Sequence, residues 1–190
     1  MFYYKVIIKL YALAIRLSSL FSKKSAALLA GQNATLKKIS KTTPVCKKTT
    51  VWVHAASLGE FEQGRPIIEA LKKQDKNIRI ILSFFSPSGY EVRKNYPLAD
   101  EVVYLPLDTP KNAEQFLAHY QPNLAIIIKY EFWYYYFKTC KSLKIAVLSV
   151  STILRSNQIF FRKKNAYNQV LHFVDHFFVQ NQNTKKLLKS

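Results

Sequence analysis

The sequence contains few glycines, and their positions exclude the common nucleotide-binding loops. Only 4 of the 190 residues are glycine. None of them belongs to a GxGxxG pattern, which lets a backbone approach a dinucleotide pyrophosphate, and the GxxxxGK[ST] pattern of a P-loop is also missing. We therefore expect neither a dinucleotide-dependent enzyme nor a P-loop nucleotidase, and the sequence predicts no cofactor.

Cysteine and histidine are too scarce and too scattered to predict a metal site. The two cysteines, Cys46 and Cys140, lie far apart, and the four histidines show no spacing typical of metal ligands. We expect free thiols in a reducing compartment. The histidines are expected to pack in the core or to face solvent.

Acidic residues are also few. Eleven Asp and Glu residues stand against 29 Lys and Arg, which gives a formal net charge of +18. This excess favours a polyanionic partner, such as nucleic acid, an anionic membrane face or a phosphorylated substrate. With 49% hydrophobic residues, a chain of this length can bury one sizeable core, and we expect one domain with an appendage.

The appendage is the apolar segment of residues 2–21, which contains three charges, Lys5, Lys9 and Arg16. On a helix of 3.6 residues per turn, these charges lie within roughly 40° of each other. A narrow cationic stripe on an apolar helix is typical of a segment that lies in the interface of an anionic membrane. A transmembrane span and a helix docked on its own domain are the alternatives, whereas the interrupting charges argue against a signal peptide. Residues 1–40 are thus predicted to be a membrane-interfacial helix and a basic linker.

The body of the chain, residues 41–190, alternates between short aliphatic or β-branched runs and helical patterns. Strands are predicted over residues 51–56, 78–85, 101–105, 123–129, 145–150 and 176–180, and helices over 60–73, 90–95, 110–119, 132–141, 158–173 and 183–189. Such alternation predicts parallel strands joined by right-handed crossovers. The predicted fold class is α/β, a Rossmann-like parallel sheet with helices on both faces.

The first predicted strand ends in a turn that carries an acid. Ser57 is placed to cap the next helix, and Gly59 allows a close backbone approach or an unusual φ. Glu60 then stands in the first turn of the helix. Ligands of open α/β sheets lie outside the carboxyl ends of the strands, where this turn is expected. Glu60 is therefore either an acid that complements the helix dipole or a carboxylate that acts on a substrate.

Each later strand also ends in polar residues, which the predicted topology brings to one rim. These residues are Ser86, Ser88, Asp108, Lys129, Glu131, Ser149, Ser151 and Arg155. Asp108 or Thr109 can instead cap the next helix. Lys129 and Glu131 flank Tyr130, so in an extended segment they would share one side and form an ion pair or contact a ligand.

Several of these segments together resemble one enzyme family. Residues 56–66, ASLGEFEQGRP, look like the serine–x–glycine–glutamate turn of the 3-deoxy-D-manno-octulosonic acid (Kdo) transferases, which build the inner core of lipopolysaccharide. The resemblance continues in order through SFFSPSGY (83–90), LPLD (105–108), KYEFW (129–133), SVS (149–151) with Arg155, and FFVQN (177–181). EFW matches a glutamate–leucine–tryptophan motif of the family, although Lys129 stands where the family often has an acid. The resemblance covers nearly the whole chain.

The resemblance implies the N-terminal, acceptor-binding half of a GT-B glycosyltransferase, with the C-terminal donor-binding half absent. It implies transfer of Kdo, with inversion, from its cytidine monophosphate conjugate (CMP-Kdo) to the lipid A precursor, lipid IVA. The place implied is the cytoplasmic face of the inner membrane of a Gram-negative bacterium. Glu60 would be the general base, and the substrate-binding residues would be Ser57, Gly59, Ser86, Ser88, Lys129, Glu131 and Arg155. The chain looks truncated and is expected to be inactive alone.

Two other functions stay open. The net charge and the 14% aromatic content also fit a non-catalytic module that binds nucleic acid or a membrane. The basic residues gather around an apolar helix, however, so no nucleic acid is expected, and binding to anionic vesicles but not to RNA would decide. The second alternative is an epimerase or another glycosyltransferase with the same architecture.

Overall fold

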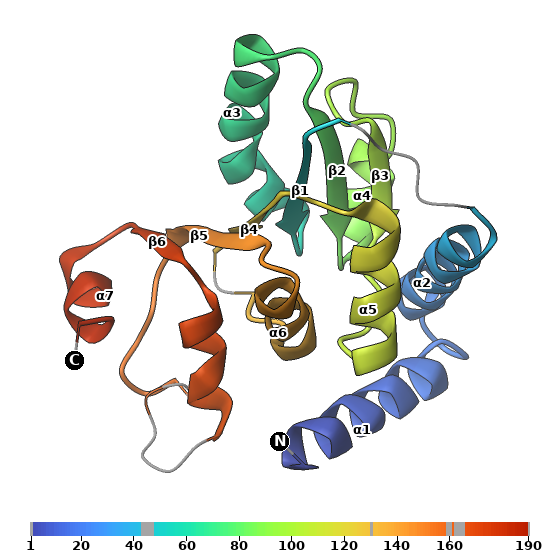
Figure 1. The fold of residues 1–190 in the computed structure, drawn as a ribbon. Helices are drawn as coiled ribbons and strands as arrows, with labels where there is room; N and C mark the ends of the chain where they lie inside the picture. The colour runs from blue at the N-terminus through green and yellow to red at the C-terminus, as the bar shows by residue number, and fades with distance from the viewer. Residues whose placement is uncertain (1, 43–47, 130, 159–160, 162–165, 190) are drawn as a thin grey trace.

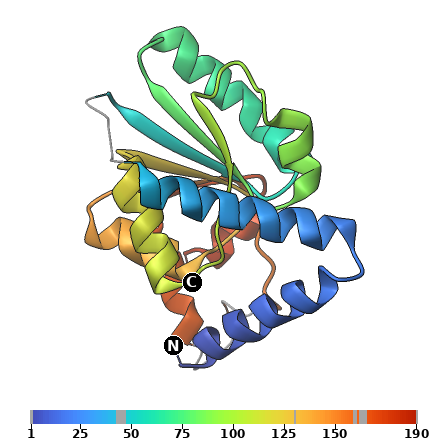
Figure 2. The ribbon, with the colours of Figure 1, turned by 90° about the vertical axis from the view of Figure 1, so that its right-hand side faces the viewer.

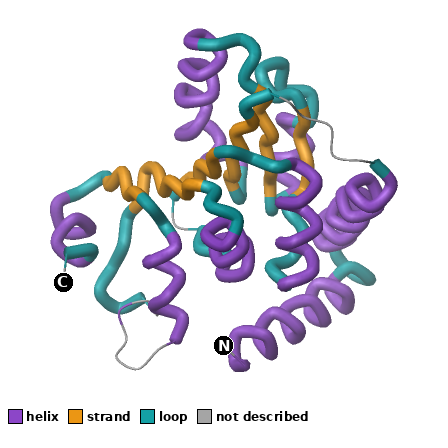
Figure 3. Tube along the Cα trace, in the orientation of Figure 1, coloured by secondary structure: helices purple, strands orange, loops and turns teal. Residues whose placement is uncertain are grey.

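Six parallel strands form one sheet in the order β3-β2-β1-β4-β5-β6 (Figures 1 and 3). The computed structural model describes residues 2–42, 48–129, 131–158, 161 and 166–189. The strands are β1 (Thr50–Ala55), β2 (Arg79–Phe84), β3 (Glu101–Tyr104), β4 (Leu124–Ile128), β5 (Ala146–Thr152) and β6 (His176–Val179). Every strand pair is parallel. The predicted Rossmann-like α/β fold is therefore confirmed.

Helices cover both faces of the sheet (Figure 2). They are α1 (Phe2–Ser18), α2 (Lys23–Lys41), α3 (Leu58–Gln74), α4 (Pro87–Arg93), α5 (Pro110–Tyr120), α6 (Tyr134–Ser142), the 3-10 helix η2 (Ala166–Phe173) and α7 (Gln182–Leu187). Because side chains alternate along a strand, β1 contributes to two cores. Val51 and Val53 pack with Ile68 of α3, whereas Trp52 packs on the other face with Phe116 of α5 and Tyr136 of α6.

The strand order reverses between β1 and β4. The chain builds β1, β2 and β3 outward in one direction, and then returns to place β4 on the other side of β1. In doubly wound sheets such a reversal opens a crevice at the carboxyl ends of the two central strands, and ligands bind there. The turns after β1 and β4 are therefore the expected place for a site.

Residues 23–41 form a helix where the sequence predicted a basic linker. The Ser22 hydroxyl caps α2 by accepting the N–H of Ser25 at 3.4 Å. The buried residues Leu28, Gln32, Thr35 and Ile39 follow one helical stripe. The Gln32 amide donates to the Leu105 carbonyl at 2.9 Å, which ties α2 to the end of β3. Two of these four positions are polar, and the ends of the segment are rich in lysine. The sequence pattern therefore did not indicate a buried helix here.

The C-terminal third differs from the prediction in one element. Residues 166–173 form a 3-10 helix rather than the end of an α-helix. Residues 159–160 and 162–165 of that predicted helix lie outside the described residues, as do Cys46 and Tyr130. Cys140 is free and buried, as predicted for a thiol.

Helix α1 has one face against the domain and one apolar face in solvent. Ile8 and Ile15 are buried, and the Tyr4 ring stacks on Tyr167 at a centroid distance of 5.2 Å. The opposite arc exposes Tyr3, Val6, Ile7, Leu10, Leu13 and Leu17. At 100° per residue, the stripe of Lys5, Lys9 and Arg16 falls between the buried and the exposed arcs. In the part of the chain described, no helix combines the length and apolarity that a bilayer span requires.

Candidate active site at the carboxyl ends of β1 and β4

Glu60 lies directly after β1, in the first turn of α3, and its side chain turns back toward the strand. Its Oε2 accepts the backbone N–H of Ala56 at 2.6 Å, and the residue is only 9% exposed. Ser57 occupies the N-cap position, but its hydroxyl makes no capping bond. Glu60 thus takes over the helix start, much as the glutamate of a capping box does. The capping role is real, and it fixes where the carboxylate stands.

The surroundings of Glu60 raise the pKa of its carboxyl group, although the dipole of α3 by itself would lower that pKa. Burial raises the pKa of this carboxyl above its ordinary value. The N–H groups of Ala56 and Ser57 and the charge of Lys129 lower it, and burial prevails. A carboxylate with a raised pKa is a stronger base than a solvated one, which suits a proton acceptor.

Glu131 is the second carboxylate of the site and follows β4. Its pKa rises to about 7, first because it is buried and second because the negative charge of Glu60 acts on it. Lys129 supplies a positive charge to the same place, since it lowers the pKa of Glu60. The structure therefore brings together Glu60, Lys129 and Glu131 from the two central strands, at the reversal of the strand order.

The turn after β4 has a conformation that the sequence did not suggest. Lys129 has a φ of 67°, in the left-handed region, rather than the extended conformation expected for the segment. The rule that residues two apart share one side therefore does not apply to Lys129 and Glu131. The Lys129 carbonyl accepts the hydroxyls of Ser149 at 2.9 Å and Thr152 at 3.3 Å, and both hydroxyl residues are fully buried. Strain of this kind, held by buried hydrogen bonds, is common at functional sites.

The turns after β1 and β2 are joined by their backbones. The Ser86 N–H donates to the Ala56 carbonyl at 2.7 Å. The Ser86 hydroxyl caps α4 by accepting the N–H of Ser88 at 3.3 Å, and the two hydroxyl oxygens are 2.9 Å apart. Gly59 has no unusual φ, which corrects one expectation, and a side chain built there would meet nothing within 4 Å. The space beside Gly59 is therefore open to a ligand.

The predicted residues after β5 divide into two groups. Ser151 has a φ of 62°, and its hydroxyl donates to Gln63 Oε1 of α3 at 3.0 Å and accepts from Gln180 Nε2 at 2.6 Å. Arg155 is exposed, and in the described part of the chain no ion pair joins its guanidinium to Glu60 or Glu131. The structure therefore adds Gln63 and Gln180 to the rim and leaves Arg155 outside the carboxylate cluster.

A chain of hydrogen bonds, which the sequence did not reveal, ties Trp133, two residues after Glu131, to the interior of the sheet. The Trp133 indole N–H donates to His54 Nε2 at 3.2 Å, so His54 must carry its proton on Nδ1. That Nδ1–H faces Ser83 Oγ at 2.8 Å, and the same oxygen accepts the indole N–H of Trp52 at 2.8 Å. Full burial lowers the pKa of His54 to about 3. The alternation along β1 was the available signal, because it places Trp52 and His54 on one face.

Asp108 caps a helix, but not the one that follows it in the chain. Thr109 caps α5 by accepting the N–H of Asn112 at 3.2 Å. Asp108 is fully buried and accepts the N–H groups of Tyr135 and Tyr136 at 3.0 Å, at the start of α6, and also the hydroxyl of Tyr4 from α1. Burial raises its pKa to about 6 in spite of these hydrogen bonds. Asp108 therefore holds the start of α6 in place and is not exposed to a ligand.

Comparison with known proteins identifies the family of this site. The sequence model described as "3-Deoxy-D-manno-octulosonic-acid transferase (kdotransferase)" matches residues 29–190. The chain belongs to the Kdo transferase family. The match includes α2 from residue 29 onward and both central turns, so the predicted resemblance is confirmed.

Individual Kdo transferases match a shorter stretch. The Kdo transferase of Aquifex aeolicus is 37% identical over 87 residues, which are 45% of this chain and 24% of the relative. A probable mitochondrial Kdo transferase of Arabidopsis thaliana is 36% identical over 84 residues, 44% of this chain and 19% of the relative. The Haemophilus influenzae enzyme is 34% identical over 85 residues, 44% of this chain and 20% of the relative. The matched segments thus span about a fifth to a quarter of these relatives' lengths.

Among solved structures the likeness shows the fold alone. A UDP-N-acetylglucosamine 2-epimerase matches with a TM-score of 0.55 and 15% identity, over 75% of this chain and 45% of the epimerase chain. The UDP-GlcNAc 2-epimerase of Methanocaldococcus jannaschii matches with a TM-score of 0.53 and 18% identity, over 74% of this chain and 42% of that chain.

Two glycines of α3 offer a paired test of the site in this Kdo transferase domain. Gly59→Ala places a methyl group in open space, so stability should stay the same or rise by up to about 1 kcal/mol, while ligand binding falls. Gly64→Ala places one 2.8 Å from Cδ1 and Cγ1 of the buried Ile128. Overpacking of about 1–3 kcal/mol should outweigh the helix propensity gained. Thermal unfolding of both variants checks this, and equal losses of stability would show that the space at Gly59 is not free.

Proposed function

We propose that this chain is the acceptor-binding part of an inverting Kdo transferase that uses CMP-Kdo as donor and the lipid A precursor, lipid IVA, as acceptor. Membership of the family supports the transferase class. The observation that carries the assignment of residues is the pair of carboxylates, the buried Glu60 and the half-buried Glu131, at the reversal of the strand order. Both belong to the segments that resemble the family's motifs.

In the proposed reaction Glu60 is the general base. A hydroxyl of the acceptor sugar enters the open space beside Gly59 and attacks the anomeric carbon of Kdo. A carbon–oxygen bond forms there while the bond from that carbon to the phosphate oxygen of cytidine monophosphate breaks, and the hydroxyl proton passes to Glu60. Assistance of this kind contributes about 10²–10⁴-fold to the rate. Lys129 keeps Glu60 more ionised than burial alone would, so the base stays available.

The hydroxyls and cations of the rim bind the acceptor in this proposal. Ser57, Ser86 and Ser88 lie on the turns after β1 and β2, which the bond from the Ser86 N–H to the Ala56 carbonyl joins. Lys129 provides a positive charge for a phosphate of the acceptor. Arg155, on an exposed loop, is proposed for the periphery of the same rim.

The donor is proposed to bind in a second, C-terminal half, as the resemblance to GT-B Kdo transferases implies, and the segments that match this chain span only about a fifth to a quarter of its relatives' lengths. We expect the chain alone to give no Kdo transfer from CMP-Kdo to lipid IVA. Addition of the C-terminal half of a family member should restore the product, as measured by mass spectrometry of the lipid. Robust transfer by the isolated chain would contradict this division of the two substrates.

Helix α1 is proposed to hold the enzyme on the cytoplasmic face of the inner membrane of a Gram-negative bacterium. Its exposed apolar arc, bordered by Lys5, Lys9 and Arg16, suits the boundary between acyl chains and anionic headgroups. Each basic residue near such a surface is worth about 1 kcal/mol. The acceptor is itself a lipid, so the reaction has to take place at this surface.

Changing Leu10 and Leu17 to Glu should therefore release the protein from anionic vesicles, because both side chains are more than half exposed on the apolar arc. Flotation with liposomes measures this. Val92→Glu on α4, where Val92 is 57% exposed, is a matched control that should leave binding unchanged. Undiminished flotation of the double variant would rule out α1 as the membrane contact, and equal binding to RNA would favour a general polyanion-binding module.

A further inference from the structure

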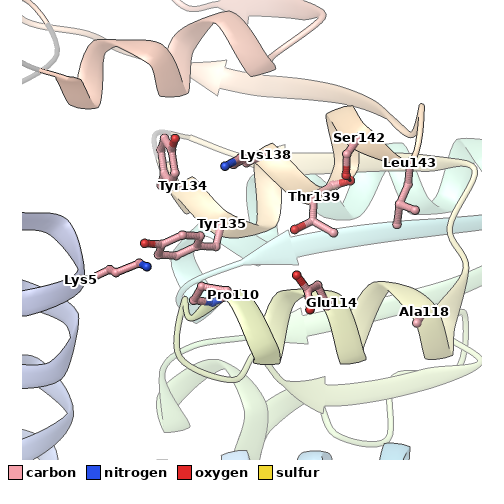
Figure 4. A pocket seen from close by; sticks show the side chains of 10 residues that line it. All are labelled: Lys5, Pro110, Glu114, Ala118, Tyr134, Tyr135, Lys138, Thr139, Ser142 and Leu143. Atoms are coloured by element: carbon pink, nitrogen blue, oxygen red, sulfur yellow. Dashed lines mark hydrogen bonds between the residues drawn. The ribbon is translucent and has the colours of Figure 1, made fainter. Parts of the chain in front are cut away.

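A groove of about 550 Å³ lies between α5 and α6, with α1 at one end of it (Figure 4), and neither Glu60 nor Glu131 lines it. Glu114 and Ala118 of α5 form one wall, and Tyr135 and Lys138 of α6 form the other. Lys5 reaches the groove from α1. Three elements that are distant in the sequence thus build one concave surface, and nothing in the proposed transfer reaction uses it.

The Tyr135 hydroxyl has no partner in this groove. Tyr135 is 7% exposed, yet its hydroxyl is buried and finds no hydrogen-bond partner among the described residues. In Figure 4 the polar ends of Tyr135 and Lys5 point toward one another at the α1 end of the groove. A buried polar group without a partner costs about 1–3 kcal/mol, and an acceptor supplied by a ligand would remove that cost.

The lining favours an anionic amphiphile. Lys5 and Lys138 bring two ammonium groups, against the single carboxylate of Glu114, which Figure 4 shows beside Thr139, away from Lys5. The walls between these charges are mostly apolar, with Tyr134, Ala118 and Leu143 among them. A phosphate has acceptor oxygens both for ammonium groups and for a tyrosine hydroxyl. An attached acyl chain would cover the apolar walls.

Contacts of Tyr4 attach α1 to the domain at one end of the groove. The Tyr4 hydroxyl donates to Asp108, and the Tyr4 ring packs on Tyr134 and Tyr135, each at a centroid distance of 5.7 Å. Because Lys5 follows Tyr4, this contact holds Lys5 at the groove. Lys5 also belongs to the stripe that borders the exposed apolar arc of α1, so the groove opens beside the surface proposed to meet the bilayer.

We propose that the groove between α5 and α6 binds one anionic phospholipid of the bilayer, with the headgroup phosphate at Lys5, Tyr135 and Lys138 and an acyl chain along the apolar walls. The lipid is a structural ligand, distinct from both substrates of the transfer reaction. The inference rests on the proposed function only for the presence of a membrane. Bound lipid would join α1, α5 and α6 where the membrane-facing helix meets the domain.

The test uses dihexanoyl-phosphatidylglycerol below its micelle concentration, so that it does not depend on α1 binding a bilayer or on Kdo transfer. Calorimetric titration of the full chain should show saturable binding, much tighter than that of inorganic phosphate or uncharged dihexanoylglycerol. Tyr135→Phe should weaken lipid binding about tenfold, the amount expected for one hydrogen bond to a charged group. Lys138→Gln should also weaken it.

The Tyr135→Phe variant separates a ligand site from a structural role. Because the hydroxyl has no partner in the folded chain, its removal should leave the melting temperature unchanged or raise it. Lys111→Gln is a matched control, since Lys111 is exposed on α5 but does not line the groove. Full affinity in Tyr135→Phe, equal weakening by Lys111→Gln, or equal binding of inorganic phosphate would each overturn the proposal.

Discussion

Glu60→Gln is expected to lower the turnover of the reconstituted Kdo transferase at least about a hundredfold while the thermal unfolding curve stays nearly unchanged. The amide keeps an oxygen that can accept the Ala56 N–H, which Glu60 Oε2 now accepts at 2.6 Å. It also keeps the size of a side chain that is 9% exposed. It loses the negative charge and, with it, the ability to take up a proton. Turnover with CMP-Kdo and lipid IVA, in the presence of a donor-binding half, is the measurement.

The opposite result would have an equally clear meaning. The structure shows that Glu60 closes the start of α3, so a purely structural role is a serious competitor. If that were its only role, the substitution would cost less than about 1 kcal/mol of stability and turnover would persist. Near-normal turnover would therefore reduce Glu60 to a helix cap, and Glu131 would be the next carboxylate to test.

A titration tests the proximity of the two carboxylates without any turnover. The charge of Glu60 is one of the two causes that raise the pKa of Glu131 to about 7. In Glu60→Gln that charge is gone, so the pKa of Glu131 should fall, while its burial keeps it above the ordinary value. Carbon NMR of the side-chain carboxyl measures the shift. Glu62→Gln changes an acid on the same helix that pairs instead with Arg93 at 2.6 Å, and it should leave the pKa of Glu131 where it is.

The sequence could predict the sheet and the position of Glu60 because both depend on local patterns. Parallel strands covered on both faces read as short aliphatic runs, and an acid after a strand and a small-residue turn marks the carboxyl end of that strand. Contacts between distant segments leave no such pattern. Asp108 looked like a cap for α5, the adjacent helix, yet it caps α6, whose first residues lie more than 25 positions away. The bond from Trp133 to His54 spans 79 positions.

Backbone conformation was also beyond the sequence pattern. Lys129 and Ser151 take up left-handed φ values of 67° and 62° without being glycine. Only the tertiary hydrogen bonds explain why this is tolerated, since the Lys129 carbonyl is held by Ser149 and Thr152 from a neighbouring strand. Which residues gather at this rim was therefore predictable in part, whereas their mutual geometry was not.

Asp108→Ala is expected to lower the stability of the chain by about 3 kcal/mol or more. It removes a helix cap worth about 0.5–2 kcal/mol and leaves buried donors unsatisfied at about 1–3 kcal/mol each. The donors are the N–H groups of Tyr135 and Tyr136 and the hydroxyl of Tyr4. Denaturant unfolding measures the loss. Tyr4→Phe removes only the last of these donors and should cost about 1 kcal/mol. Equal losses in the two variants would show that the contact of Asp108 with α6 contributes nothing.

The pH dependence separates the charge of Asp108 from its shape. Its pKa is about 6 in the folded chain and near 3.8 when unfolded. Between these values the folded chain holds a proton that the unfolded chain has released, so this residue makes stability fall as the pH rises from about 4 to 6. Glu131 acts in the same direction and His54 in the opposite one. The comparison must therefore be between wild type and Asp108→Asn, in which only the contribution of Asp108 disappears.

A slope of stability against pH that is unchanged by Asp108→Asn would mean that Asp108 titrates like an exposed acid. A slope that is less negative, or more positive, in Asp108→Asn would show that the domain accepts a buried, poorly solvated carboxyl group to hold the start of α6. Because Glu131 lies just before that helix, the same carboxylate would then fix one end of the turn that carries the second acid of the site.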